Sequence, residues 1–132
     1  MEADKIYKTA VIGCGRIGSL FDLDDKRKII SSHCGAYNAH KSTKLVSVCD
    51  IDINKAASCS DQWKVGNYYS DFKKMLDNEK IDILSICTHP YSHHEIIDFA
   101  VKYDLKAIFC EKPISHSIAS ANQIVKLCKE ND

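Results

Sequence analysis

The sequence lacks an excess of charge of either sign and lacks any long hydrophobic run. Its 132 residues include 18 basic and 18 acidic side chains, which gives zero formal net charge and an isoelectric point near 7.0. This balance offers no electrostatic footprint for nucleic acid or for an anionic membrane surface. No apolar stretch approaches the roughly 18 residues of a membrane span, and residues 1–8 are too polar for a signal peptide. We therefore expect neither nucleic acid nor a membrane as a partner.

The seven cysteines lack the spacing of a disulfide, redox or zinc motif. Their number is odd, no C-x-x-C pair occurs, and Cys49, Cys87 and Cys110 lie inside apolar runs, where cysteine behaves as a small buried hydrophobe. This pattern predicts a cytoplasmic protein with reduced thiols. The histidines provide no complete ligand set, since His33 beside Cys34 has no visible third partner. We therefore expect no metal site.

Internal repeats, low-complexity tracts and linkers rich in proline, glycine or serine are also missing, so residues 1–132 are expected to form one domain. What the chain contains is an alternation of strand and helix patterns. Runs of nearly continuous apolar and β-branched residues predict strands buried on both faces at 7–13, 44–50, 81–88 and 105–111, with a shorter edge candidate at 65–69. Helical stripes lie at 56–63, 72–76, 92–103 and 117–129.

Two helix starts carry explicit signals. Ser92 followed by Glu95 has the spacing of a capping box, and Ser117 is a plausible N-cap. Because strands and helices alternate along the chain, the sequence predicts an α/β fold with a doubly wound parallel sheet, that is, a Rossmann fold.

Three glycines, Gly13, Gly15 and Gly18, follow the first predicted strand in the spacing G-x-G-x-x-G. Between a strand and a helix that begins near Arg16, such a turn binds the pyrophosphate of a dinucleotide. The first glycine permits the tight turn, the second allows close approach of the phosphates, and the third allows the helix to pack against the strand. The alternative is an ordinary turn without a ligand.

Asp50 ends the second predicted strand and is the expected ribose-binding acid. Its carboxylate would accept hydrogen bonds from the ribose hydroxyls and repel a 2′-phosphate, which favours NAD, although Arg16 leaves NADP possible. The distance from Gly18 to Asp50 is 32 residues rather than the usual ~20. We interpret residues 21–35 as an insertion between the first helix and a second helical piece at 36–41.

Four of these segments should share one edge of the sheet. Gly13, Asp50, Thr88 and Glu111 each come at or directly after the end of a predicted strand. In a parallel sheet the carboxyl ends of the strands meet at one edge, which is where doubly wound folds bind ligands.

At this point the chain resembles the N-terminal domain of the Gfo/Idh/MocA oxidoreductases over nearly its whole length. The resemblance is carried by GCGRIG (13–18), VCDID (48–52), THPYSHHE (88–95) and CEKP (110–113). The third segment is similar to the family's T-P-N-x-x-H, with Pro90 and His94 matching its Pro and His, while His89 and Tyr91 depart from the usual Thr and Asn. The fourth matches the family's E-K-P without change.

The resemblance implies an NAD(P)-dependent oxidoreductase that moves a hydride between a nicotinamide and a secondary alcohol of a sugar or cyclitol. Lys112 would be the catalytic residue, since an ammonium group there stabilises charge on the alcohol oxygen. The implied cofactor contacts are Gly13, Cys14, Gly15, Arg16, Ile17, Gly18, Asp50, Ile51, Thr88, His89, Pro90, His94, Glu111 and Lys112. For Cys14 there are two hypotheses, a thiol with a pKa lowered by a helix N-terminus or a small residue under the cofactor.

The family also implies a second domain that supplies most of the substrate site and the homo-oligomer interface and that is absent from these 132 residues. The chain alone would then bind a cofactor without turning over a substrate. Two other hypotheses are a non-catalytic dinucleotide-sensing or CoA-binding Rossmann module, and a related enzyme with another substrate, such as a biliverdin-reductase-like protein. The E-K-P segment favours the enzyme, because a sensor has no need for a lysine beside the nicotinamide.

Overall fold

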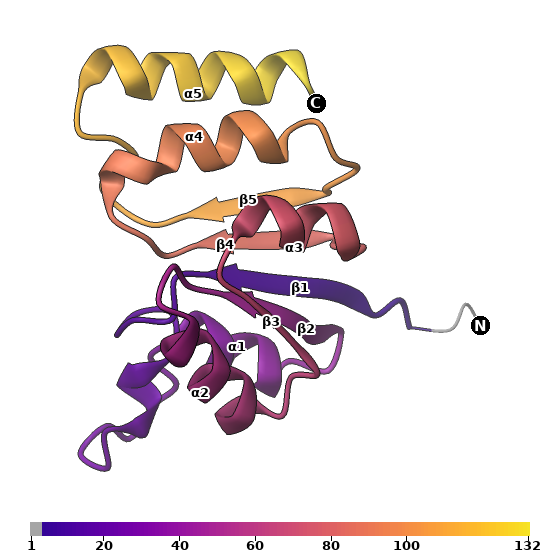
Figure 1. Ribbon diagram of the computed structural model, residues 1–132, viewed down its shortest axis with the longest axis vertical. Coiled ribbons are helices and arrows are strands. Elements are labelled where there is room, and N and C mark those ends of the chain that lie inside the picture. The colour runs from indigo at the N-terminus through magenta and orange to yellow at the C-terminus, as the bar shows by residue number, and fades with distance from the viewer. Residues whose placement is uncertain (1–3) are drawn as a thin grey trace.

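Five parallel strands form the centre of the structure, a computed structural model that describes residues 4–132. The strands are β1 (Tyr7–Ile12), β2 (Thr43–Cys49), β3 (Asn67–Tyr69), β4 (Ile83–Ile86) and β5 (Ala107–Cys110). They lie in the order β3-β2-β1-β4-β5, so the chain reverses its direction of winding between β1 and β4 (Figure 1). This is the predicted doubly wound sheet, and all five strands fall within the predicted ranges to within one residue.

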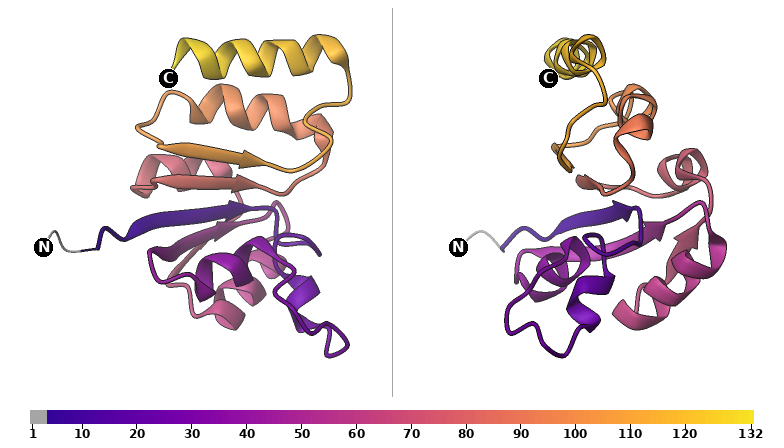
Figure 2. Two further views of the ribbon diagram at one scale, coloured as in Figure 1. Left: turned by 180° about the vertical axis from the view of Figure 1, so that it is seen from behind. Right: turned by 90° about the vertical axis from the view of Figure 1, so that its left-hand side faces the viewer.

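Helices cover both faces of the sheet (Figures 1 and 2). The helices α1 (His33–Ala39) and α2 (Ile53–Trp63) lie on one face, and α3 (Phe72–Asn78) and α4 (Pro90–Ala100) lie on the other. The last helix, α5 (Ile118–Glu130), packs on the outside of α4. Within residues 4–132, none of the helices combines the length and the apolar character needed to cross a bilayer.

The core has two layers because successive strand residues point to opposite faces. In β1, Ala10 and Ile12 belong to the layer under α3 and α4, while Val11 belongs to the layer under α1 and α2. The first layer is aliphatic and includes Met75, Leu84, Ile86, Ile97 and Ile124. The second is small and rich in sulfur, with Cys14, Cys34, Val48 and Cys59. All seven cysteines are free thiols.

One strand differs from the prediction of burial on both faces. Ala107 and Phe109 in β5 are exposed, and Phe109 keeps 59% of its surface accessible. The reason is position, since β5 is the last strand of the sheet and pairs only with β4. An apolar run does not tell a central strand from an edge strand that has one uncovered face.

The capping box predicted at Ser92 is wrong. Helix α4 begins two residues earlier, at Pro90, with His89 as its N-cap residue. Proline suits the first helical position because its missing N–H has no partner there in any helix. Ser92 therefore lies within the first turn, where its hydroxyl donates to the His89 carbonyl at 2.9 Å and accepts from the Thr88 hydroxyl at 2.6 Å. The N-cap at Ser117 is confirmed, since its side chain accepts from the Ser120 N–H.

The helix expected to begin near Arg16 is interrupted. A single turn follows the glycines, then the short 3-10 helix η1 (Leu20–Leu23), and α1 starts only at His33. The first two N–H groups of α1, on His33 and Cys34, donate to the carbonyls of Ile17 and Gly18 at 3.0 and 2.9 Å. These bonds span sixteen residues instead of the four of an α-helix.

Helix α1 is therefore the displaced continuation of the first helix and not a second helical piece at 36–41. The difference between sixteen and four means that twelve residues have been inserted into one helix. The same twelve account for the distance of 32 residues, rather than about 20, between Gly18 and Asp50. Asp22 holds the insertion closed, because its carboxylate accepts from the N–H groups of Ser31 and Ser32 at 2.7 and 3.0 Å.

Candidate functional site

The carboxyl ends of four strands lie level with one another. Ile12 of β1 pairs with Cys49 of β2 and with Ile86 of β4, and Ile86 pairs with Cys110 of β5. The residues that follow them therefore form a row along one edge of the sheet: Gly13, Asp50, Cys87 and Glu111, with Thr88 one residue further on. The predicted gathering of the four segments at one edge is confirmed.

At Gly13 and Gly18 the backbone leaves no room for a side chain, as the spacing of the glycines predicts. Gly13 has φ +99°, and a Cβ on it would lie 2.6 Å from the Cys87 carbonyl oxygen. A Cβ on Gly18 would lie 2.0 Å from the Gly13 carbonyl oxygen, so the turn packs directly on the end of β1. Gly15 is different, because a Cβ there would meet nothing within 4 Å. Its open side faces away from the protein.

The same turn presents unpaired donors. Among residues 4–132, no acceptor is bonded to the backbone N–H groups of residues 15–18. Ser19 and Leu20 both donate to the Gly15 carbonyl, at 3.0 Å each, which gives the segment one helical turn. Consecutive free N–H groups at the start of such a turn form a site for an anion. Arg16 is exposed beside them, while Ile17 is partly buried.

Asp50 is held in place by two backbone donors. One carboxylate oxygen accepts from the Cys14 N–H and the other from the Asp52 N–H, both at 2.9 Å. Each oxygen keeps a further lone pair, so the carboxylate can still accept from two hydroxyls. The bond to Cys14 ties the end of β2 to the glycine turn. Ile51, the next residue, is almost fully exposed.

The Cys14 side chain points into the protein, away from any ligand on the turn. It is 1% exposed and lies in the sulfur-rich core layer near Cys34 and Cys59. Contact with the Cys59 sulfur and burial both raise the pKa of the Cys14 thiol. This contradicts the hypothesis of a thiol with a lowered pKa and leaves Cys14 as a small residue that fits beneath the turn.

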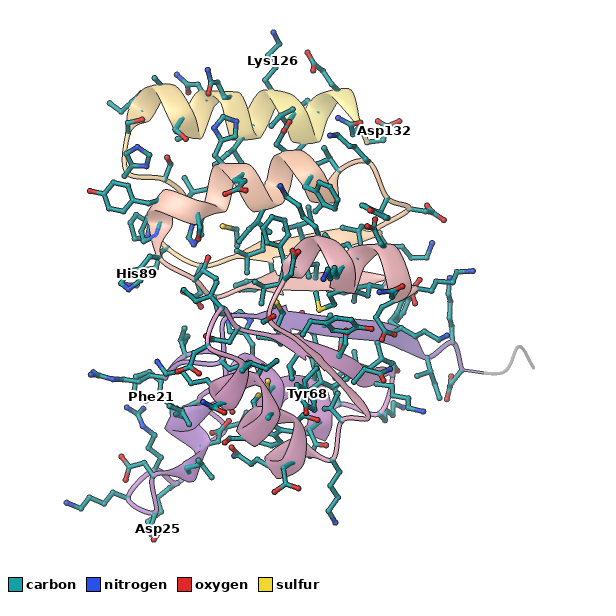
Figure 3. The ribbon with its side chains drawn as sticks, viewed as in Figure 1. Phe21, Asp25, Tyr68, His89, Lys126 and Asp132 are labelled. Atoms are coloured by element: carbon teal, nitrogen blue, oxygen red, sulfur yellow. The ribbon has the colours of Figure 1, made fainter. Side chains whose placement is uncertain are left out.

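The residues of the segment after β4 differ in how exposed they are. Thr88 is half-buried and Pro90 starts α4, whereas His89 is exposed at the edge that carries the strand ends (Figure 3). His94 is partly buried on α4. The neighbouring His93 is fully buried. From the sequence it is a candidate only as a metal ligand together with His89, at an i, i+4 spacing, and it has no predicted cofactor role.

His93 bridges two loops of the candidate site. Its ring nitrogens lie 2.9 Å from the Thr88 carbonyl oxygen and 3.0 Å from the Ile114 carbonyl oxygen. One of these carbonyls follows β4, and the other belongs to the loop after the Glu-Lys-Pro segment. His93 therefore fixes the distance between these loops. Its i, i+3 spacing from Pro90 and its place in the apolar stripe with Ile96 and Ile97 were the available signals in the sequence.

The Glu-Lys-Pro segment leaves the end of β5. The Glu111 N–H donates to the Ile86 carbonyl at 2.9 Å, and the peptide between Lys112 and Pro113 is cis. Lys112 is exposed. The Glu111 carboxylate accepts from His33 Nε2 at 2.8 Å, and this hydrogen bond lowers the pKa of the Glu111 carboxyl. His33 is thus a second residue at the site that the sequence analysis did not assign to it.

Two cavities lie beside the row of strand ends. A cavity of about 490 Å³ lies between η1 and α2, and another of about 470 Å³ lies between α1 and Phe109 of β5. The first is lined by Cys14 of the glycine turn and the second by Ile17 and His33, whereas neither is lined by Asp50, Thr88 or Lys112. The row of strand ends is thus an open surface beside them. Across residues 4–132, no three histidine, cysteine or acidic side chains gather as a metal site would require.

Comparison with known proteins identifies relatives of this architecture. Residues 7–132 match the model of the family GFO_IDH_MocA, described as an oxidoreductase family with an NAD-binding Rossmann fold. A D-apiose dehydrogenase from Paraburkholderia graminis is 26% identical over 125 residues, which cover 95% of this chain and 30% of that protein. An inositol 2-dehydrogenase from Salmonella typhimurium is 23% identical over 94% of this chain and 34% of its own length.

Solved structures of dehydrogenases and other oxidoreductases have the same fold as this chain. A myo-inositol 2-dehydrogenase from Lactobacillus plantarum superimposes with a TM-score of 0.76 at 28% identity, covering 96% of this chain and 34% of that one. An oxidoreductase from Agrobacterium radiobacter, solved with NAD+, L-tartaric acid and magnesium, gives 0.79 at 25% identity over 96% of this chain and 33% of its own. The chain spans about a third of the length of these relatives. From the family match over residues 7–132, this chain belongs to the GFO_IDH_MocA oxidoreductases and is an NAD-binding Rossmann domain.

Proposed function

We propose that this chain is the cofactor-binding part of a dehydrogenase that transfers a hydride between NAD and a secondary alcohol of a sugar or cyclitol. The observation that carries the proposal is the set of free N–H groups at residues 15–18, beside the open face of Gly15 and level with Asp50. An anion and a pair of ribose hydroxyls need donors and a carboxylate in this arrangement. The relatives named as apiose and inositol dehydrogenases support the substrate class.

The residues present fit a dinucleotide. The N–H groups of residues 15–18 would bind the pyrophosphate, which can approach closely because Gly15 has no side chain. The free lone pairs of Asp50 would accept from the adenosine ribose, and its charge would disfavour a 2′-phosphate. Exposed Arg16, beside the free N–H groups, is a cation able to offset part of that repulsion, so NADP is proposed as a weaker second cofactor.

At the other end of the row, Lys112 is proposed to be the catalytic residue. The bound nicotinamide supplies or accepts the hydride. Lys112 Nζ exchanges a proton with the substrate hydroxyl, and its ammonium form stabilises the negative charge that develops on the hydroxyl oxygen. Glu111 contacts the nicotinamide ribose or orients Lys112. The cis peptide at Pro113 and the contacts of His93 set the path of this segment. Thr88, His89, Pro90 and His94 are proposed to border the nicotinamide.

Substrate selection is proposed to belong to a second domain of the complete enzyme, which would also form a homo-oligomer. In support, Lys112 is exposed in this chain, and Phe109 beside it keeps 59% of its surface accessible. A catalytic lysine works in a site from which water is largely excluded. The 132 residues alone are therefore expected to bind NAD without turning over an alcohol.

The test is a titration of the chain with NADH and NADPH, followed by nicotinamide fluorescence. We expect saturable binding of NADH that is tighter than binding of NADPH. Asp50→Ala should weaken NADH by roughly tenfold or more, because hydrogen bonds to a charged group contribute about 1.5–3 kcal/mol each. The same substitution should narrow the preference for NADH over NADPH.

Asp52→Asn is the matched control, because Asp52 is the neighbouring exposed acid and asparagine removes its charge while keeping the N-cap of α2. It should leave the affinity for NADH unchanged. Absence of binding by the folded wild-type chain, or equal loss in both variants, would contradict the proposal.

A further inference from the structure

Four side chains from separate parts of the chain form one line of hydrogen bonds that ends beside Lys112. The Tyr37 hydroxyl lies 2.7 Å from Ser85 Oγ, Ser85 Oγ lies 2.8 Å from His33 Nδ1, and His33 Nε2 lies 2.8 Å from Glu111 Oε1. Tyr37 and His33 come from α1, Ser85 from β4 and Glu111 from the end of β5. The line crosses the sheet from α1 to the Glu-Lys-Pro segment.

The donors and acceptors along this line have one consistent direction. A Glu111 carboxylate only accepts, so at 2.8 Å His33 Nε2 is the donor and carries a proton. In the neutral ring, Nδ1 then accepts from the Ser85 hydroxyl, and Ser85 accepts from Tyr37. Burial raises the pKa of Tyr37, so its hydroxyl retains the proton that it donates. Every link has one donor and one acceptor.

The surroundings keep water from competing for these bonds. Ser85 is fully buried, and the side chains of His33 and Glu111 are only 12% and 20% exposed. The His33 ring meets Phe109 edge-on, with centroids 4.9 Å apart. Hydrogen bonds to an ionised group in such a place are stronger and more directional than those at an open surface.

We propose that His33 is a positioning residue of this site. It fixes the Glu111 carboxylate, and so the segment that carries Lys112, relative to the cofactor surface. This inference rests on the proposed function for its catalytic meaning, although the His33–Glu111 contact is independent of it. His33 is the first residue of α1, and Ser32 and Asp22 fix that helix end. Asp22 at the start of the twelve-residue insertion and Ser32 at its end therefore hold the helix end that carries His33.

Two substitutions separate positioning from general structural support. Glutamine places its amide N–H where Nε2 of histidine lies, whereas asparagine reaches only the Nδ1 position. His33→Gln should therefore keep the bond to Glu111, and His33→Asn should keep only the bond to Ser85. The control is His40→Gln, because His40 is an exposed histidine at the other end of α1.

The first readout is the titration of the Glu111 carboxyl carbon by NMR, assigned with Glu111→Gln. Besides His33, the titratable group that lowers the pKa of Glu111 is Lys112, which every variant retains. The thiols of Cys87 and Cys110 lie near Glu111, and burial raises the pKa of both, so they stay uncharged during the acid titration. The midpoint should stay low in the wild type and in His40→Gln. In His33→Gln it should keep the lowering that comes from the hydrogen bond, which is the largest cause, and lose the smaller part that comes from the charge of His33. In His33→Asn it should rise toward the ordinary value of about 4.3.

The second readout is NADH affinity near pH 8, which should fall roughly tenfold in His33→Asn and little in His33→Gln. Equal effects of the two substitutions on the Glu111 midpoint would overturn the inference. So would a wild-type imidazole spectrum that places the proton on Nδ1 of His33, a measurement that needs no variant. If the wild-type chain binds no NADH while the Glu111 midpoints behave as expected, the proposed function fails and the contact stands.

Discussion

Two glycines of the same turn should respond in opposite ways to the same substitution. A methyl group at Gly18 would lie 2.0 Å from the Gly13 carbonyl oxygen, about 1.4 Å closer than an ordinary contact. The oxygen is a backbone atom and the Cβ is bonded directly to the backbone, so neither can turn aside and the end of β1 must move. Overpacking of this kind costs about 3 kcal/mol. At Gly15 the methyl group would meet open space, and Gly15→Ala should change the free energy of unfolding by less than about 0.5 kcal/mol.

These free energies translate into measurable melting temperatures. Unfolding entropy near 2.1 cal/mol/K per residue gives about 0.28 kcal/mol/K for 132 residues. Gly18→Ala should therefore melt about 11 °C below the wild type, and Gly15→Ala within about 2 °C of it. Gly15→Ala, although stable, should bind NADH poorly, because its methyl group occupies the face that a pyrophosphate must approach. We expect NADH to bind at least about tenfold more weakly to Gly15→Ala.

The assays are a thermal melt and a fluorescence titration with NADH on the same samples. A Gly15→Ala chain that is stable and binds NADH like the wild type would refute the assignment of the turn to the pyrophosphate. A Gly18→Ala chain that melts with the wild type would refute the packing of the turn on β1. The two outcomes are independent, so each link of the reasoning is tested by itself.

Deleting residues 21–32 should join the turn to α1 as one continuous helix. The far-UV helical signal should be retained or increased, and unfolding should stay cooperative. A chain that no longer unfolds cooperatively would contradict the interpretation of these residues as an insertion into one helix. His93→Ala should lower the free energy of unfolding in urea by about 2 kcal/mol, since a fully buried ring and its contacts with the part-buried carbonyls of Thr88 and Ile114 are lost, whereas exposed His116→Ala should cost little. The hydrogen bond to Glu79 raises the pKa of Tyr69 to about 12, so this contact stabilises the fold below pH 10 and is lost as the pH rises toward 12. Tyr69→Phe should flatten that alkaline loss in pH-dependent melts.

Several features of the site were predictable because they depend on local sequence. Runs such as 44–50 and 81–88 are apolar enough to be strands whatever their neighbours, and parallel strands place their carboxyl ends at one edge. Gly13, Asp50 and Glu111 therefore had to lie in one row once the alternation of strands and helices was recognised. Burial was less predictable, since Phe109 sits in a run like the others and yet is exposed at the end of the sheet.

The contacts between distant segments were not predictable. The apolar stripe of α4 indicates that His93 faces inward, but it does not indicate that the ring meets the Ile114 carbonyl, 21 residues away. The sequence shows that the distance from Gly18 to Asp50 is unusually long. Only the hydrogen bonds from α1 back to Ile17 and Gly18 show that the extra residues interrupt a helix.

By itself, the sequence determined the order of the strands along the chain, the glycine turn, the acid after β2 and the Glu-Lys-Pro segment after β5. Each of these follows from residues close together in the chain. Only the tertiary structure decided that His33 meets Glu111, 78 residues away, and that Cys14 points into a buried group of thiols. Such pairings depend on how helices lie across the sheet, because side chains meet according to packing and not to their separation in sequence.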